Sequence, residues 1–189
     1  MTDDRPEETL GNPLRLAGYD AERLRAGLVE AAPAVRRFLF GLCGDWHRSE
    51  DLLQESLLKA WQNRDRFDGR AGLKTWVFTI ARNHWLTNLR QQARRSREEP
   101  VSESCEIGQD GRPEAAASRG ELAEAVARAL ARLPSEQREV LALREHGGLT
   151  VAEVAAVLGV PVGTAKSRAR YALVRLAEDL EPFRQELEP

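Results

Sequence analysis

The sequence predicts an all-α protein: two small helical domains joined by a flexible acidic linker, the C-terminal one a helix-turn-helix. Three observations predict this fold class. Apolar residues recur at spacings of three and four along most of the chain, which is the period of an amphipathic helix. Helix-capping residues stand at the ends of these stretches. The alternating β-branched runs typical of strands are absent.

Two domains are expected because the aromatic residues are unevenly distributed. Eight of the eleven lie between Phe38 and Trp85, so the C-terminal part must pack on Leu, Val and Ala. Two compositions of this kind predict two separate cores. The expected organisation is a disordered segment over 1–19, a first domain over 20–95, a flexible linker over 96–120, a second domain over 121–181 and an acidic tail over 182–189.

The first domain is expected to hold three helices, over about 24–44, 49–63 and 73–95, with a loop over 65–72. Pro33 should break or restart the first helix, because proline lacks the backbone N–H that a helix interior uses. Gly44 should end it. Ser49 is the expected N-cap of the second helix, since its hydroxyl can accept a hydrogen bond from a backbone N–H of the first turn.

The second domain is expected to contain a helix over 121–133, a further helix, and then two short helices separated by a tight turn. Thr150 and Glu153 form the capping-box pattern that begins the first of these two. Gly159 ends it, because glycine tolerates the left-handed conformation common after a helix. Pro161 suits the start of the next helix. A helix-turn-helix of this kind places its second helix in the major groove of DNA.

The second helix of this motif has the composition of a groove-binding helix. At about 100° per residue, one side carries an expected apolar stripe of Val162, Ala165, Ala169, Ala172, Leu173 and Leu176. Between 162 and 177 four residues are basic and none is acidic. The residues expected to bind DNA through phosphates and base edges are Thr164, Lys166, Ser167, Arg168, Arg170 and Tyr171. A solvated basic surface helix is the alternative, but the capped helix and glycine turn before it favour DNA.

The net charge of -2 conceals strong local charge. From Arg66 to Arg97 there are eight basic residues and one acid, whereas from Glu98 to Glu124 there are eight acids and two bases. A phosphate backbone meets the local field rather than the total charge. A nucleic-acid partner is therefore compatible with this composition.

Other classes of protein fit the sequence poorly. Cys43 and Cys105 lack the spacing of a disulfide framework, and a structural zinc site needs four ligands where only Cys43 and His47 are suitably spaced. No apolar run has the length of a membrane span, and the first residues do not resemble a signal peptide, so a cytoplasmic protein is expected. The sequence has no nucleophile elbow, P-loop or catalytic carboxylate pair. We therefore expect neither an enzyme nor a cofactor.

Five motifs, in this order and spacing, carry a family resemblance. They are 49–61 (SEDLLQESLLKAW), 66–70 (RFDGR), 73–83 (LKTWVFTIARN), 133–140 (LPSEQREV) and the helix-turn-helix over 149–173. The chain resembles bacterial RNA polymerase sigma factors of the extracytoplasmic-function (ECF) subfamily over about 29–180. This resemblance implies a protein that directs core RNA polymerase to promoters and helps melt DNA, nucleoid-associated when bound to polymerase. It also admits an anti-sigma protein as a partner.

In the family, region two binds the polymerase clamp and the minus-ten element, and region four binds the minus-thirty-five element and the polymerase flap. The resemblance implies that four residues on one helix face bind polymerase: Asp51, Gln54, Glu55 and Leu58. Carboxylates and an amide on an exposed face suit an arginine-rich partner. Ordinary solvated polarity is the alternative interpretation of these residues.

Melting of the minus-ten element requires stacking surfaces and cations that hold an exposed strand. The residues expected to supply them are Arg66, Phe67, Arg70, Lys74, Arg82, Asn83 and Arg90. Trp76, Ile80 and His84 are expected in the core, and Trp85 is expected to pack. Thr87 stands where the family often carries an aspartate, and we assign it no role.

Two alternatives stay open. The acidic linker over 96–120 either threads through polymerase towards the RNA path, as the resemblance implies, or serves as a solvated spacer. A stand-alone helix-turn-helix regulator would share the DNA-binding motif. It would not need the helix over 51–61 or the basic, aromatic segment over 66–95. Binding to core polymerase separates a sigma factor from such a regulator.

Overall fold

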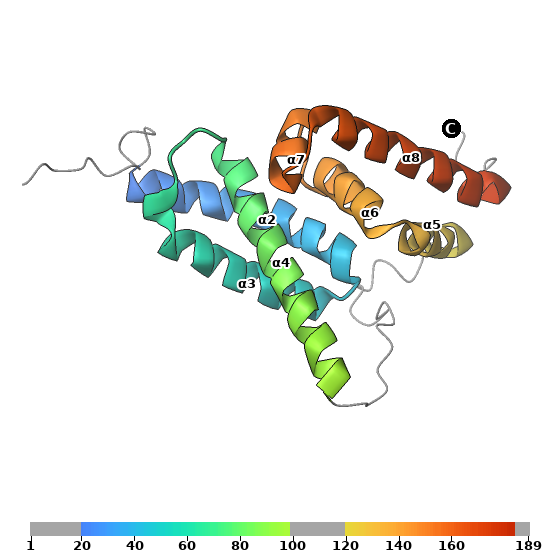
Figure 1. Cartoon of the computed structure of the whole chain (residues 1–189), viewed down its shortest axis with the longest axis horizontal. Helices are drawn as coiled ribbons and strands as arrows, with labels where there is room; N and C mark the ends of the chain where they lie inside the picture. The colour runs from blue at the N-terminus through green and yellow to red at the C-terminus, as the bar shows by residue number, and fades with distance from the viewer. Residues whose placement is uncertain (1–19, 99–119, 184–189) are drawn as a thin grey trace, which may run out of the picture.

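The computed structural model describes residues 20–98 and 120–183, and every regular element in these two ranges is helical (Figure 1). The longer helices are α2 (Ala21–Cys43), α3 (Trp46–Gln62), α4 (Leu73–Glu98), α5 (Gly120–Arg132), α6 (Ser135–Leu141), α7 (Val151–Leu158) and α8 (Val162–Leu180). The short segments are η1 (Arg64–Arg66), the π-helical η3 (Ala142–His146) and η4 (Glu181–Phe183). The predicted all-α class is confirmed.

Three predicted segments fall largely outside the described residues. The N-terminal segment 1–19 lies wholly outside them. Of the linker over 96–120, only the ends are described: 96–98 continue α4, and Gly120 begins α5. Of the acidic tail over 182–189, only the first two residues are described.

Helix α2 is continuous, so the expected break at Pro33 is wrong. Pro33 lies on the exposed side of the helix, one turn after Val29, which is 67% exposed. The carbonyl that loses its intrahelical partner there can be solvated by water, which reduces the cost of the missing N–H. Gly44 ends the helix as expected, with a left-handed φ of 70°.

Helix α3 begins one turn earlier than expected. Asp45 is its N-cap, and its carboxylate accepts a hydrogen bond of 2.9 Å from the backbone N–H of Arg48. The expected N-cap, Ser49, is instead fully buried inside the helix, where its hydroxyl donates to the carbonyl of Trp46. Aspartate and serine cap equally well, so the earlier cap gives a longer helix at no local cost.

The helix-turn-helix is confirmed in detail. Thr150 accepts a hydrogen bond from the backbone N–H of Glu153, whose carboxylate bonds back to Thr150. The hydroxyl and backbone N–H of Thr150 lower the pKa of that carboxyl. Gly159 ends α7 with a φ of 67°, and Pro161 stands directly before α8. The sequence therefore determines this motif through local chemistry alone.

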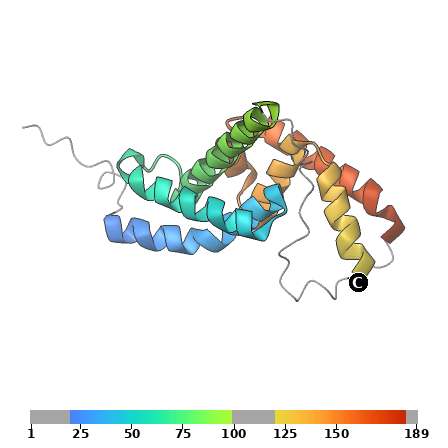
Figure 2. The ribbon, with the colours of Figure 1, turned by 90° about the horizontal axis from the view of Figure 1, so that it is seen from below.

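The main hydrophobic cluster spans both helical units, which differs from the expected two separate cores, and a smaller second cluster of Leu133, Leu141 and Ala172 lies in the second unit. Helix α2 packs on η3 and α4 packs on α7, as two perpendicular views show (Figures 1 and 2). One buried cluster runs from Phe38 and Phe78 in the first unit to Leu143 and Val154 in the second. The ring of Phe78 projects from α4 onto Gly147 of the second unit. The second unit, whose core residues are mainly aliphatic, thus completes the aromatic core of the first unit.

Candidate nucleic-acid and protein interface

One face of α3 presents the four residues expected to bind polymerase. Asp51, Gln54 and Glu55 are all exposed, and Leu58 on the same face is 56% exposed. The opposite side of the helix is buried. An apolar side chain among carboxylates, held on a rigid helix, is a surface with the features of a protein interface.

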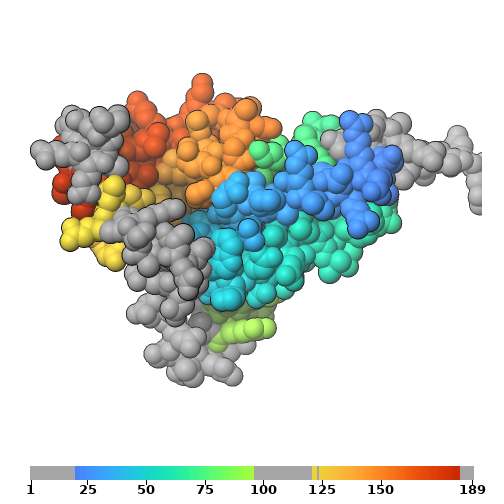
Figure 3. Space-filling view, turned by 180° about the vertical axis from the view of Figure 1, so that it is seen from behind, coloured from blue at the N-terminus to red at the C-terminus, as the bar shows by residue number. Residues whose placement is uncertain are grey.

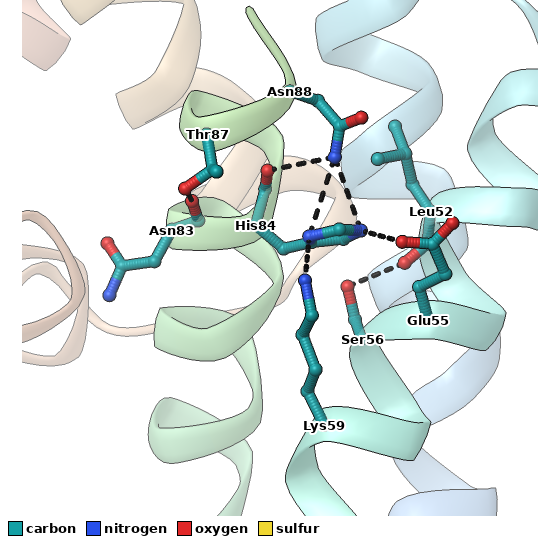
Figure 4. A network of polar contacts seen from close by, with 8 residues as sticks. All are labelled: Leu52, Glu55, Ser56, Lys59, Asn83, His84, Thr87 and Asn88. Atoms are coloured by element: carbon teal, nitrogen blue, oxygen red, sulfur yellow. Dashed lines mark hydrogen bonds and ion pairs between the residues drawn. The ribbon is translucent and has the colours of Figure 1, made fainter. Parts of the chain in front are cut away.

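Beneath this face lies a buried histidine that holds Glu55 (Figure 4). The His84 side chain comes from α4 and is 4% exposed, and its Nε2 lies 2.7 Å from the Glu55 carboxylate. On the other side of the ring, Nδ1 is contacted by the ammonium of Lys59 from α3. Asn88 donates to the His84 backbone carbonyl at 3.2 Å and lies beside the ring. Two helices thus contribute to one polar network.

These contacts assign the protonation of His84. A neutral ring that carries its proton on Nε2 donates to Glu55 and accepts from Lys59, which satisfies all three groups. Burial lowers the pKa of His84 below its ordinary value, and the Lys59 charge lowers it further, while Glu55 acts in the opposite direction. His84 was expected only as a core residue; its burial is confirmed, and its contact with Glu55 was missed.

The end of η1, the loop after it and the first turn of α4 supply exposed cations. Arg66, Arg70 and Lys74 are exposed, and Arg70 makes only a solvent-exposed ion pair of 3.3 Å with Asp68. Such an exposed pair contributes little to the free energy of folding, so the guanidinium can exchange Asp68 for another partner.

Phe67 does not lie where the sequence analysis placed it. Its ring is 1% exposed and packs against Trp76 with centroids 5.1 Å apart. In this structure Phe67 is a core residue and cannot stack on a base, so the expected stacking role is wrong. The three residues of η1 precede it and turn the chain so that its ring faces inward.

The outer face of α4 is divided. Asn83 and Arg90 are exposed as a DNA-binding surface requires. Arg82 is not: its Nε donates to the Glu139 carboxylate at 2.8 Å, and its side chain is 19% exposed. Trp85 is buried beneath the guanidinium of Arg48, so its expected packing role is confirmed.

Helix α8 exposes most of the residues expected to bind duplex DNA. Lys166, Ser167, Arg170 and Tyr171 are exposed, and the Arg170 guanidinium lies 5.4 Å from the centroid of the Tyr171 ring. Thr164 and Arg168 on the flanks are half-buried.

The packing side of α8 is narrower than expected. Ala165, Ala169 and Ala172 are buried, whereas Val162 and Leu173 are 45% and 57% exposed. Alanine lets the helices approach closely, so the contact is confined to the alanine row and excludes residues that lie roughly 60–80° from it.

Glu139, the partner of Arg82, was missed entirely by the sequence analysis. Glu139 stands four positions before Leu143, on the apolar side of its helix, and is 7% exposed. A carboxylate at an apolar helical position is the signal that would have found it.

The sequence argues against a metal site and against a membrane span, and both concern the described residues. There, no group of three or more His, Cys, Asp or Glu side chains is placed to hold a metal ion. Cys43 is buried, and burial raises the pKa of its thiol. Among the described helices, none is both long and apolar enough to cross a bilayer.

Comparison with known proteins matches both halves of the chain. A family model of Sigma-70 region 2 matches residues 28–95, and a model of Sigma-70 region 4 matches residues 123–176. The ECF RNA polymerase sigma factor EcfG of Rhodopseudomonas palustris is 36% identical over 160 residues, which cover 82% of this chain and 84% of that protein. The sigma factor RpoE of Cereibacter sphaeroides is 37% identical over 153 residues, 79% of this chain and 81% of that protein.

A solved structure agrees with these sequence matches. The sigma factor RpoE from Bartonella quintana, solved with the anti-sigma factor NepR, aligns with a TM-score of 0.69 and 32% identity over 85% of this chain and 98% of that one. The family matches, the helix-turn-helix and the exposed face of α3 lead to one conclusion: the chain belongs to the ECF subfamily of bacterial RNA polymerase sigma factors.

Proposed function

We propose that this sigma factor engages its partners through three separate faces. The α3 face of Asp51, Gln54, Glu55 and Leu58 binds the clamp of core RNA polymerase. The loop and outer face of α4 bind the minus-ten element, and α8 binds the minus-thirty-five element. The protein acts by binding and performs no catalytic step of its own. It works in the cytoplasm, at the nucleoid, because polymerase and the chromosome are there.

The observation that carries the proposal is the arrangement of the α3 face. Its carboxylates are exposed, and one of them, Glu55, is fixed by a buried network. The His84 ring contacts Glu55 and is itself held by the ammonium of Lys59. A carboxylate held in place loses less side-chain entropy when a guanidinium binds it. Leu58 adds an apolar contact beside the charges.

The two proposed DNA-binding faces suit different forms of DNA, one a melted single strand and the other a duplex. The exposed cations Arg66, Arg70 and Lys74 lie in and beside the loop before α4, which suits the flexible backbone of a melted strand. In α8, the exposed pair Arg170 and Tyr171 stands on a helix that can enter a major groove.

The structural relative solved with an anti-sigma factor supports a third class of partner. The Bartonella protein shares 32% identity over nearly its whole length with this chain. We include an anti-sigma protein among the partners proposed here.

Binding to core polymerase tests the proposal. Asp51→Arg combined with Glu55→Arg should abolish retention of the chain on immobilised bacterial core polymerase, because two attractions become two repulsions. Glu22→Arg combined with Glu30→Arg makes the same change of charge on exposed positions of α2 and should leave retention intact. Helix content measured by circular dichroism shows whether both variants fold. Equal retention of the two variants would contradict the α3 face, and a wild-type chain that binds duplex promoter DNA but not polymerase would favour the stand-alone regulator.

A further inference from the structure

Glu55 and Lys59 lie on one side of α3, four positions apart. A glutamate four residues before a lysine is the favoured arrangement for an ion pair along a helix. Here each of the two side chains contacts a third residue. The Glu55 carboxylate lies 2.7 Å from Nε2 of His84, and the Lys59 ammonium contacts Nδ1 of the same ring. The histidine of α4 therefore occupies the space in which the two charges of α3 would meet.

Figure 4 shows how the ring is held between these two side chains. Asn88, one turn further along α4, donates to the backbone carbonyl of His84 at 3.2 Å and lies beside the ring. Ser56 on α3 is fully buried, and its hydroxyl donates to the Leu52 carbonyl at 2.6 Å, so it leaves the ring nitrogens to other partners. The His84 side chain is 4% exposed. Close packing on all sides restricts the ring to this position.

A ring in this position must be neutral. An ammonium group can only donate a hydrogen bond, and an ionised carboxylate can only accept one. The imidazole between them must therefore accept at Nδ1 and donate at Nε2, whereas a charged ring donates at both nitrogens. A neutral ring adds no positive charge beside Glu55, and a direct contact with Lys59 would add one. The ring thus preserves the negative charge of the carboxylate.

The carboxylate that the ring separates from Lys59 lies on the surface proposed to bind polymerase. Glu55 is 61% exposed, although the ring that contacts it is buried. Figure 3, which views the molecule from behind, shows the atoms of α3 at the surface of the first unit. A carboxylate already paired with a neighbouring lysine attracts a further cation weakly, because that cation must displace the first one. The charge of Glu55 therefore serves binding only while Lys59 is held elsewhere.

We propose that His84 is a positioning residue for polymerase binding: its ring separates Glu55 from Lys59 and so keeps the carboxylate available to a cation of the clamp. Because His84 is buried, it acts through Glu55 and not by contact with polymerase. The inference rests on the proposed function for the identity of the partner, whereas the separation within the free chain can be tested without polymerase.

Nitrogen NMR of isotope-labelled histidine in the free chain tests the separation. At pH 7.5 the His84 ring should be neutral with its proton on Nε2, and its signals are assigned by their loss in His84→Gln. In Lys59→Met the ring loses the donor to Nδ1, so the Nδ1 signal should shift more than the Nε2 signal. A charged ring at pH 7.5, or a proton on Nδ1, would overturn the proposal.

Affinity for core polymerase tests the consequence. His84→Leu removes both ring nitrogens, so Lys59 can reach Glu55. The affinity should fall about 10-fold, because the carboxylate loses both its fixed orientation and its available charge. Adding Lys59→Met to His84→Leu should recover about 2-fold or more of this loss, since the competing cation is gone. His84→Gln, whose amide can donate to Glu55 and accept from Lys59, should bind within about 2-fold of the wild-type chain.

Val77→Ala is the control for loss of stability, because it removes buried atoms from α4 two turns before His84. Its affinity should equal that of the wild-type chain once the folded fraction, measured by circular dichroism, is taken into account. The NMR measurement on the wild-type chain stays decisive should His84→Leu fail to fold.

The outcomes separate this inference from the proposed function. Equal affinities of His84→Leu and the wild-type chain would overturn the inference alone. So would a double variant as weak as His84→Leu, because the effect of His84 would then owe nothing to Lys59. A Glu55→Gln chain that binds core polymerase like wild type would instead remove Glu55 from the proposed function, and the inference with it.

Discussion

The two sides of α4 hold two polar networks that differ in how far they leave their charged groups exposed. On the side of α3, His84 is buried but the Glu55 carboxylate it contacts is 61% exposed, so the acidic face is complete and open. On the side of the second unit, Glu139 is buried and pairs with the half-buried guanidinium of Arg82. The acidic face of α3 is therefore open in the free chain, whereas the Arg82 guanidinium on α4 already has a partner.

The largest expected effect separates a buried ion pair from an exposed one by the stability that each contributes. Arg82→Ala leaves Glu139 buried without its cation, which should lower the free energy of unfolding by about 3–5 kcal/mol. Urea denaturation followed by circular dichroism measures this loss. Arg70→Ala removes a cation from an exposed pair and should change the free energy by less than about 0.5 kcal/mol. Similar losses for the two variants would place Glu139 in solvent.

The next effect concerns the packing of one unit on the other. Gly147→Ala places a Cβ 2.3 Å from the Leu143 carbonyl oxygen and close to Phe78, so the second unit must shift. We expect a loss of about 1–3 kcal/mol in the free energy of unfolding together with a larger radius of gyration. Gly163→Ala, where an added Cβ meets nothing within 4 Å, is the matched control. A compact, fully stable Gly147→Ala chain would show that the junction is loose.

A third effect tests the DNA-binding face proposed on α8. Arg170→Ala should weaken binding of polymerase holoenzyme to the preferred upstream element by about 1–3 kcal/mol and relax its sequence preference. Thermal stability of the free chain should not change, because the side chain is exposed. Competition binding against mutated upstream elements gives the measurement. Unaltered preference at every position would remove Arg170 from base recognition.

The smallest effect is a dependence on pH with a known sign. Burial lowers the pKa of His84, and the nearby charge of Lys59 lowers it further, while Glu55 raises it. Burial likewise lowers the pKa of His146, with Arg37 acting in the same direction and Glu145 in the opposite one. The folded chain thus binds fewer protons than the unfolded one, so stability is complete above about pH 6.5 and is lost as the pH falls below it. Urea denaturation between pH 7.5 and pH 5 measures the loss.

The two histidines sharpen the comparison because His84 lies between α4 and α3, whereas His146 lies at the junction of the two units. His146→Gln should reduce the pH dependence of the radius of gyration, since its ring lies at the junction against Gly41. His84→Gln should reduce the pH dependence of stability and leave the dimensions unchanged. If His84→Gln changed the pH dependence of the radius of gyration, and His146→Gln changed only that of stability, the two networks would not be independent.

Local chemistry explains which parts of the fold could be predicted. The Thr150–Glu153 capping box and the left-handed Gly159 depend on neighbours in sequence, and both were placed correctly. The N-cap at Asp45 was missed because Ser49 has nearly the same capping preference, and only burial decides between them.

Contacts between distant segments explain what could not be predicted. Burial of Phe67 depends on Trp76 and on the turn that η1 makes before it. The pairing of Arg82 with Glu139 joins positions 57 residues apart, and only the packing of one unit on the other brings them together. The exposed residues of α3 and α8 were found from helical periodicity and the family resemblance, and their binding roles stay predictions.

Energy transfer between the two units tests the central claim most directly. Fluorophores on cysteines introduced at Glu30 of α2 and Glu178 of α8, both exposed, in a chain with Cys43 and Cys105 replaced, would report their separation. High transfer in the free chain that falls on addition of core polymerase and promoter DNA is the predicted result. Transfer that is unchanged in the active promoter complex would contradict the separation of the two units on the promoter.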